Sequence, residues 1–468
     1  ENAVDALTFA AGSAGYAFVE INPSYRANPE TDTVDVTFNL KEGQRVYIDR
    51  INVVGNTQTL DSVIRRELMV GEGDAFNRSL VERSRNNLRA LGFFKDVTIE
   101  ETRGSAPDRS VVNVTVQEQP TGELSVGAGF SSVDSFVLNL GVTQRNFRGR
   151  GQNVVARAEW GSLRQQIDFR FTEPKFLGRD LRAGFDLFHT RYDLSEYSSY
   201  DYRSTGGGVR LSYPLNGYSL FSLRYFLKDD EVLIPAGYCN GTGSSALCEQ
   251  AGSFMNSSAG YTLMVDRRND PVRPTRGWTA SLRQDFAGIG GDVNYIKTEA
   301  DAAWYWGIRP NWTVSVQGST GYVSGWNGDP IRINDRFFKG GNSFRGFETA
   351  GMGARDLTTT DALGGNFYAI GTVELTVPNY LPEEYGIKTS LFADFGTIGM
   401  LDDRYKTDTT TGLPNANIVD DLALRAAAGV SIHWRSPMGP IRFDLSKVLS
   451  KEDYDKTETF RFSTSTQF

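Results

Sequence analysis

Apolar and polar side chains alternate from about residue 122 to the end of this chain, in segments of roughly ten residues separated by turns. Segment 163–172 shows the two faces of such a stretch: Ile167, Phe169 and Phe171 on one, and Gln166, Asp168 and Arg170 on the other. Successive side chains of a β-strand point to opposite faces, so the pattern predicts strands that separate two solvents. A soluble sandwich would turn its charges outward, whereas a membrane barrel turns apolar side chains to lipid and charges into a wet lumen. The aromatic last residue, Phe468, favours the barrel.

The alternating region contains sixteen candidate strands. A bacterial barrel with both ends on the same side of the membrane needs an even number, and closure removes free edges from the hydrocarbon. Short turns at 146–151 and 437–440 alternate with long loops at 229–255, 324–364 and 401–421. We therefore predict a sixteen-stranded antiparallel transmembrane barrel over residues 120–468.

Residues 1–119 follow a different pattern. Helical periodicity is found at 4–14, 61–68 and 77–91, with strand-like segments around it. Segment 14–21 resembles 91–98, and 34–38 resembles 112–116 at almost the same offset, which indicates two copies of one small α/β module. We expect the C-terminal part of one module at 1–45 and a complete β-α-α-β-β module at 46–119. The open edge of its sheet can accept an extended peptide, or charge can simply protect it.

Composition narrows the possibilities. No run of 18 apolar residues is present, so no transmembrane helix is expected. A net charge of -8 argues against nucleic acid as a partner. The two cysteines, Cys239 and Cys248, share one loop, which suits a local disulfide in an oxidising compartment. We expect a leader and further N-terminal sequence to precede residue 1 in the exported protein.

The sequence offers little chemistry. No Ser/His/Asp arrangement is evident, and neither His189 nor His433 is close in sequence to the cysteines, as a zinc site would need. The glycine-rich segment 351–353 does not lie between a strand and a helix, so it is not a phosphate cradle. We expect no catalytic residue, no metal and no cofactor.

Five segments carry a family resemblance. They are Gly55-Asn56 with Leu88–Phe94; Asp266-Arg267-Arg268 with Pro274–Gly277; Arg336-Phe337-Phe338-Lys339-Gly340-Gly341-Asn342-Ser343-Phe344-Arg345-Gly346-Phe347; Asp361–Asn366; and Ser436–Ile441. In this order they resemble the outer-membrane barrel-assembly branch of the bacterial POTRA–barrel (surface antigen) family, across essentially the whole chain. The resemblance implies that the N-terminal modules are periplasmic POTRA domains and that the chain is not an enzyme.

The resemblance also implies that the loop tip Arg345-Gly346-Phe347 folds back into the lumen. A guanidinium in a partly dry lumen needs a hydrogen-bonded carboxylate. Glu374 and Asp394 have the lumen-facing parity on the strands that follow, and the resemblance suggests the same two partners. We predict an Arg345–Glu374–Asp394 cluster; the alternative is a surface arginine on a mobile loop.

Barrel closure requires the first strand, at 122–130, to pair with the last, at 459–468. Glycine weakens a strand interior, and the last strand ends in small side chains. We predict a weak lateral seam whose edge templates the strands of incoming barrel proteins, or alternatively a tight seam that small residues fit. The seam residues are Leu124, Val126, Gly127, Gly129, Phe462, Thr464, Thr466 and Phe468.

The predicted function is that of a central assembly subunit, which folds and inserts outer-membrane β-barrel proteins. Its implied partners are unfolded barrel proteins, accessory lipoproteins, periplasmic chaperones and outer-membrane lipid. The resemblance maps Glu72 to a lipoprotein contact; the alternative is a solvated loop glutamate. Three rival functions are a polypeptide-secretion translocator of the same superfamily, a passive porin and a barrel enzyme.

Overall fold

The computed structural model describes residues 2–16, 19–28, 33–41, 45–131, 135–240, 243–379, 381–407, 415–436 and 439–464. The contacts divide the chain into two compact units, one of residues 1–123 with 143–154 and one of residues 124–142 with 155–468. Within the described residues, no helix is both long and apolar enough to cross a membrane.

The complete N-terminal module has the predicted β-α-α-β-β order. Its elements are β3 Tyr47–Val54, α2 Asp61–Arg65, α3 Arg78–Ala90, β4 Phe94–Arg103 and β5 Arg109–Glu118. Asn77 caps α3, because its side chain accepts hydrogen bonds from the amides of Ser79 and Leu80. The central strand β5 pairs in parallel with β3 and antiparallel with β4. The apolar faces of the strands and helices enclose a core that includes Ile48, Ile64, Leu88, Val97 and Val114.

The preceding segment contains α1 Asn2–Ser13 and a hairpin of β1 Glu20–Asn28 with β2 Thr33–Lys41. β2 contains the repeat segment 34–38, whereas β1 begins only at the end of segment 14–21. Part of the repeat, at residues 17–18, lies outside the described residues.

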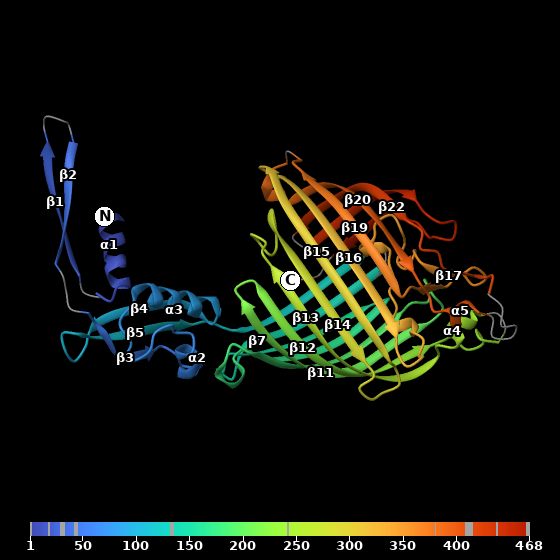
Figure 1. Cartoon of the computed structure of the whole chain (residues 1–468), viewed down its shortest axis with the longest axis horizontal. Helices are drawn as coiled ribbons and strands as arrows, with labels where there is room; N and C mark the ends of the chain where they lie inside the picture. Colours follow the sequence, from blue (N-terminus) through green and yellow to red (C-terminus); the bar gives the residue numbers. More distant parts are fainter. Residues whose placement is uncertain are drawn as a thin grey trace. The chain divides into compact units, whose positions relative to one another are not determined.

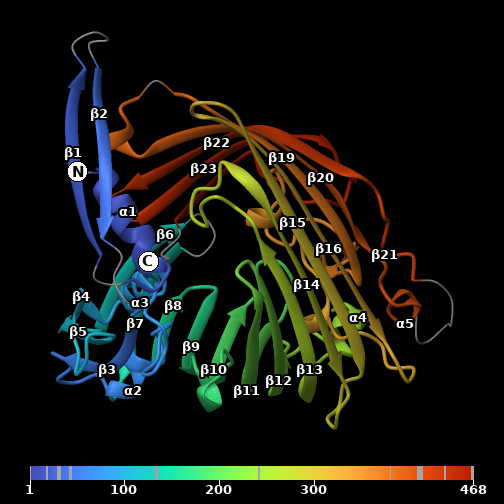
Figure 2. The same ribbon diagram turned by 60° about the vertical axis from the view of Figure 1, so that its left-hand side comes forward.

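Sixteen strands form the large sheet, as predicted (Figure 1). They are β6 Gly122–Ser131, β7 Ser135–Phe147, β8 Gln152–Gly161, β9 Arg164–Glu173, β10 Arg182–Asp193, β11 Asp201–Asn216, β12 Ser219–Leu233, β13 Gly252–Asp266, β14 Arg276–Ala287, β15 Tyr295–Arg309, β16 Trp312–Gly325, β19 Phe367–Val377, β20 Ile387–Gly399, β22 Arg425–Ser436, β23 Gly439–Ser450 and β24 Phe460–Thr464. Each pairs with its neighbour along the chain, and β6 and β24 are the two ends of the order. Figure 2 shows the sheet curled into a barrel.

The two faces of the sheet differ as the alternation predicts. Exposed apolar side chains such as Ile167, Leu187, Trp304 and Trp306 cover one face. The interior beside β9–β15 is lined mainly by polar and charged groups, including Asp168, Arg170, Asp186, Lys228, Arg283 and Asp285. An apolar exterior around a polar lumen is the membrane-barrel arrangement.

The long surface segments carry their own elements. These are η1 Phe176–Gly178, α4 Ser245–Cys248, η2 Ile333–Asp335, η3 Gly341–Ser343, β17 Ala354–Asp356, β18 Ala362–Gly364, η4 Glu383–Tyr385, α5 Asp403–Lys406 and β21 Ile418–Val419. β17 pairs with both β18 and β21, and an apolar cluster around Leu247, Ile333 and Leu363 joins the loops. The loops therefore form a packed layer.

Candidate functional site

The segment between β16 and β19, residues 326–366, is packed into the protein. The side chains of Phe344 and Phe347 at its tip are fully buried and make an edge-to-face contact, with ring centroids 5.3 Å apart. Gly346, between them, has φ +88°, and a Cβ there would lie 3.0 Å from Cβ of Ala427 on β22. Glycine is therefore required for the tip to lie this close to the barrel wall.

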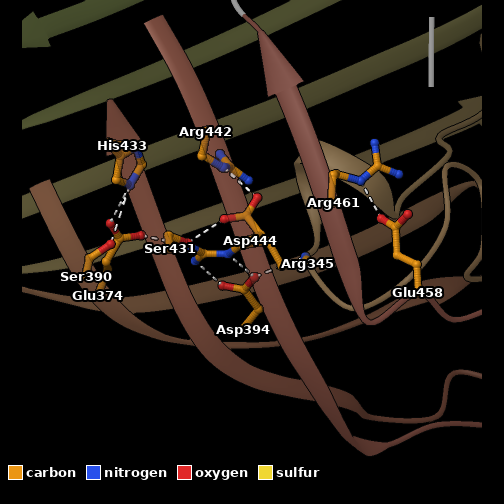
Figure 3. A network of polar contacts seen from close by, with 10 residues as sticks. All are labelled: Arg345, Glu374, Ser390, Asp394, Ser431, His433, Arg442, Asp444, Glu458 and Arg461. Carbon is orange, nitrogen blue, oxygen red and sulfur yellow. Dashed lines mark hydrogen bonds and ion pairs between the residues drawn. The ribbon is translucent and has the colours of Figure 1, made fainter. Parts of the chain in front are cut away.

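Arg345 is held by side chains from three strands (Figure 3). Its Nε and Nη2 donate to the two carboxylate oxygens of Asp394 on β20, each at 2.8 Å. Its Nη1 donates to Glu374 on β19 at 2.9 Å and to Ser431 on β22 at 3.2 Å. The structure thus brings together the three predicted residues, and only 7% of the Arg345 side chain is exposed. The ion pairs and hydrogen bonds with these three side chains replace the water that the buried guanidinium has lost.

Further contacts hold the two carboxylates that bind Arg345. Thr372 donates to Asp394 at 2.8 Å, and the backbone amide of Arg345 donates to the same carboxylate at 3.1 Å. His433 Nε2 lies 3.6 Å from the Glu374 carboxylate. Phe392 also contributes, because Cζ of Arg345 lies 3.5 Å from the centre of its ring. These contacts anchor the loop tip to β19, β20 and β22.

The loop tip also pairs with the segment that precedes the last strand. Lys456 and Glu348 are joined by a backbone hydrogen bond of 3.1 Å, and the amide of Glu458 donates to the carbonyl of Gly346 at 3.0 Å. Arg461 on β24 pairs with Glu458 and donates to the Thr349 hydroxyl at 3.3 Å. The buried loop therefore organises residues 451–459 as well as the barrel wall.

Sequence reasoning missed a second buried ion pair in this region. Arg425 on β22 and Asp455 pair at 3.0 Å, and both side chains are 0% exposed. Arg425 also donates to the carbonyls of Asp421 and Ala423 and to the Tyr454 hydroxyl. The two residues are 30 positions apart, so no local motif signals the pair.

Two other cations were also missed: Arg336, which is buried on the loop, and Lys297, which is partly buried and contacts the loop from β15. Arg336 donates to the carbonyls of Ile331 and Leu363 and lies over the ring of Tyr405, 4.3 Å from its centre. Lys297 on β15 donates to the carbonyl of Asp335 at 2.9 Å. The segment Arg336-Phe337-Phe338 is the only signal in the sequence, and it does not identify the partners.

The seam between β6 and β24 has no recorded pairing among the residues that the structure describes. Leu124 and Val126 on β6 are 73% and 63% exposed, while Gly127 and Gly129 lie between apolar neighbours. The described part of β24 has only five residues, and there Phe462 stacks on Phe443 of β23, 5.2 Å between ring centres. Thr464 is paired with Ile441 on β23, and Thr466 and Phe468 lie outside the described residues.

Glu72 is half exposed but has defined partners. Its carboxylate accepts from the amide of Ile51 at 3.0 Å and from Arg65 at 3.3 Å. The Ile51 bond is the main cause that lowers the pKa of Glu72. The cysteines Cys239 and Cys248 form a disulfide, and Cys248 is the last residue of α4.

Comparisons with known proteins agree with this architecture. The Omp85 superfamily domain matches residues 146–468, and the POTRA repeat, described as a surface antigen variable number repeat, matches 1–43 and 46–119. "Outer membrane protein assembly factor BamA" of Neorickettsia risticii is 30% identical over 100% of this chain and 61% of its own length. The protein of that name from Neisseria meningitidis is 26% identical over 98% of this chain and 61% of its own length. This chain thus spans about three fifths of the length of both curated relatives.

A solved structure shares the fold. The crystal structure of BamA from Haemophilus ducreyi lacking POTRA domains 1–3 has a TM-score of 0.85, at 23% identity, covering 99% of this chain and 93% of that one. The superfamily domain alone covers more than half of the chain, and it includes the barrel from the end of β7 onward together with the buried loop. This chain belongs to the Omp85 superfamily.

Proposed function

We propose that this protein is the central subunit of an outer-membrane barrel assembly machine. It folds and inserts β-barrel proteins through a weak lateral seam between β6 and β24. The observation that carries the proposal is the seam itself, where the described residues of β6 and β24 show no backbone pairing, in a sheet whose other fifteen junctions are all hydrogen-bonded. An unpaired strand edge can add the strand of another chain, and closure of a barrel is what normally removes that edge.

The mechanism needs no covalent step. Free energy comes from backbone pairing and from burial of apolar faces in lipid. The buried loop supports this function, because its tip contacts β19, β20 and β22 and, through Thr349 and Arg461, the last strand β24 at the seam. We therefore propose a non-enzymatic role, with no cofactor.

We propose an outer-membrane location with the POTRA modules in the periplasm, and domains at 1–45, 46–119 and 120–468. The proposed partners are unfolded outer-membrane barrel proteins, accessory lipoproteins, periplasmic chaperones and outer-membrane lipid. For Glu72 we propose lipoprotein docking, supported by its half-exposed carboxylate and its fixed orientation by Ile51 and Arg65. A pull-down in which Glu72→Lys retained the lipoprotein would remove this assignment.

Depletion of the full-length protein tests the function. Loss of many different barrel proteins from the outer membrane is expected. Loss of one exported polypeptide, with other barrels intact, would instead establish the alternative, a secretion translocator of the same superfamily.

A further inference from the structure

The turn between β7 and β8 belongs to the same compact unit as the complete POTRA module. The contact between them is built around Thr59, whose side chain is buried. Its hydroxyl accepts a hydrogen bond of 2.8 Å from Asn146, and the other end of that amide accepts from the backbone of Gly151 at 2.7 Å. One buried side chain of the turn thus connects the module to the turn itself.

The module side of this contact is held by one carboxylate. Glu118, at the end of β5, accepts from the amides of Thr57, Gln58 and Thr59 and from the Thr57 hydroxyl, at 2.6–3.0 Å. Four donors on one carboxylate fix the turn 57–59 in place. Glu118 lies four residues before β6, the first seam strand.

The turn side is shaped by glycine. The carbonyl of Gly149 accepts from the amide of Leu60 at 2.9 Å. Gly149 has φ +70°, and a Cβ there would lie 1.9 Å from the carbonyl oxygen of Gln58. The close approach of two backbones therefore leaves no room for any side chain at this position.

The start of β6 is tied to the same turn. The amide of Arg145 donates to the carbonyl of Thr121 at 3.1 Å, and its guanidinium pairs with Glu123 at 2.8 Å. Module, turn and the first residues of the seam strand are thus linked by consecutive short contacts.

We infer that the POTRA module is fixed to the β7–β8 turn by a joint of four residues, Thr59, Glu118, Asn146 and Gly149. Through this joint, a force that moves the module reaches the periplasmic end of the seam strand β6. These are positioning residues, and the inference rests on the proposed function of the seam. A partner that moves the module would, through this joint, change how readily the seam opens.

The test compares Gly149→Ala with Gly178→Ala in the full-length protein in lipid vesicles. Gly178 has the same φ of +70° in another short turn, but a Cβ there has no atom within 4 Å, so it controls for backbone strain. Thr59→Val, which keeps the shape and removes the acceptor hydroxyl, is the second variant. The readouts are amide exchange of residues 57–60 and 122–124, the disulfide yield of a Gly127→Cys/Ser463→Cys pair across the seam, and barrel assembly.

We expect Gly149→Ala and Thr59→Val to raise exchange in both segments about tenfold or more, and to change seam disulfide yield and assembly several-fold. Gly178→Ala should leave all three unchanged. Faster exchange at 57–60 with unaltered seam disulfide yield, or no change in exchange at all, would overturn the inference. If the wild-type protein itself assembled no barrels, the proposed function would fail, and exchange and seam disulfide yield would still decide the joint.

Discussion

Replacement of Arg345 by alanine should destabilise the barrel strongly. The change removes four side-chain hydrogen bonds and leaves Asp394, with 3% of its side chain exposed, without its cation. Breaking a buried ion pair by removing one partner costs about 3–5 kcal/mol, because the remaining charge stays desolvated. Glu374→Ala should reduce the stability of the barrel by less, since this side chain is 18% exposed and the bidentate contact of Arg345 is with Asp394 instead.

The two changes should not be additive. Once Arg345 is gone, loss of the Glu374 carboxylate removes no further ion pair with it, so the double variant should be more stable than the sum of single effects predicts, by about 1–2 kcal/mol. Arg345→Lys keeps the charge but cannot make the planar contact with both Asp394 oxygens, so it should restore only part of the loss.

Urea unfolding in lipid vesicles, followed by heat-modifiable gel mobility, measures these differences. Arg170→Ala is the matched control, because Arg170 also pairs with a lumen aspartate, Asp186, at 3.0 Å, but is 60% exposed. It should cost less than about 1 kcal/mol. An Arg345→Ala protein as stable as the Arg170→Ala protein, or strict additivity with Glu374→Ala, would refute the reasoning.

Three further results are expected. Desolvation opposes ionisation of Glu118, but its hydrogen bonds outweigh it and lower the pKa from 4.5 to about 2. The ionised carboxylate therefore contributes its full stabilisation above pH 4.5 and loses it as the pH falls toward 2. Thermal unfolding of Glu118→Gln should show a loss of stability of about 1–2 kcal/mol at pH 7 that vanishes at pH 2, and a loss that stayed constant with pH would contradict this. Asp455→Asn leaves Arg425 buried without a counter-charge and should cost about 3–5 kcal/mol by urea unfolding; a neutral variant would mean that this pair is hydrated. Reduction of Cys239–Cys248 should expose segment 234–251 to protease while the barrel keeps its gel mobility, and unchanged cleavage would show that packing alone holds α4.

Strand number and facing were predictable because alternation is a local property. Ile167 and Asp168 are neighbours in sequence, and the pleat alone sends them to opposite faces. Strand length was less predictable: β12 and β13 remain paired from Asp229↔Met255 to Val232↔Gly252, where the loop was expected. Backbone pairing continues there beyond the alternating segment, since it does not depend on which solvent the side chains meet.

The partners of Arg345 were predictable because a guanidinium in a partly dry lumen needs a carboxylate, and because the family resemblance indicated the loop. The contacts of Arg425 with Asp455 and of Thr59 with Asn146 were not found. Each joins distant segments through a side chain that is unremarkable in sequence, and only the folded register brings the atoms together. Helix α2 was shorter than its periodicity indicated, ending at Arg65, because residues 66–67 form a turn.

A disulfide across the seam would show whether the strands β6 and β24 must separate for insertion. Gly127→Cys with Ser463→Cys is introduced into a Cys239→Ser/Cys248→Ser background, so that reductant acts on the engineered bond alone. Insertion of a barrel substrate by the purified protein in vesicles is then measured before and after reduction. We expect the oxidised protein to stop inserting substrate and reduction to restore the rate. Equal insertion by the locked and reduced proteins would contradict it.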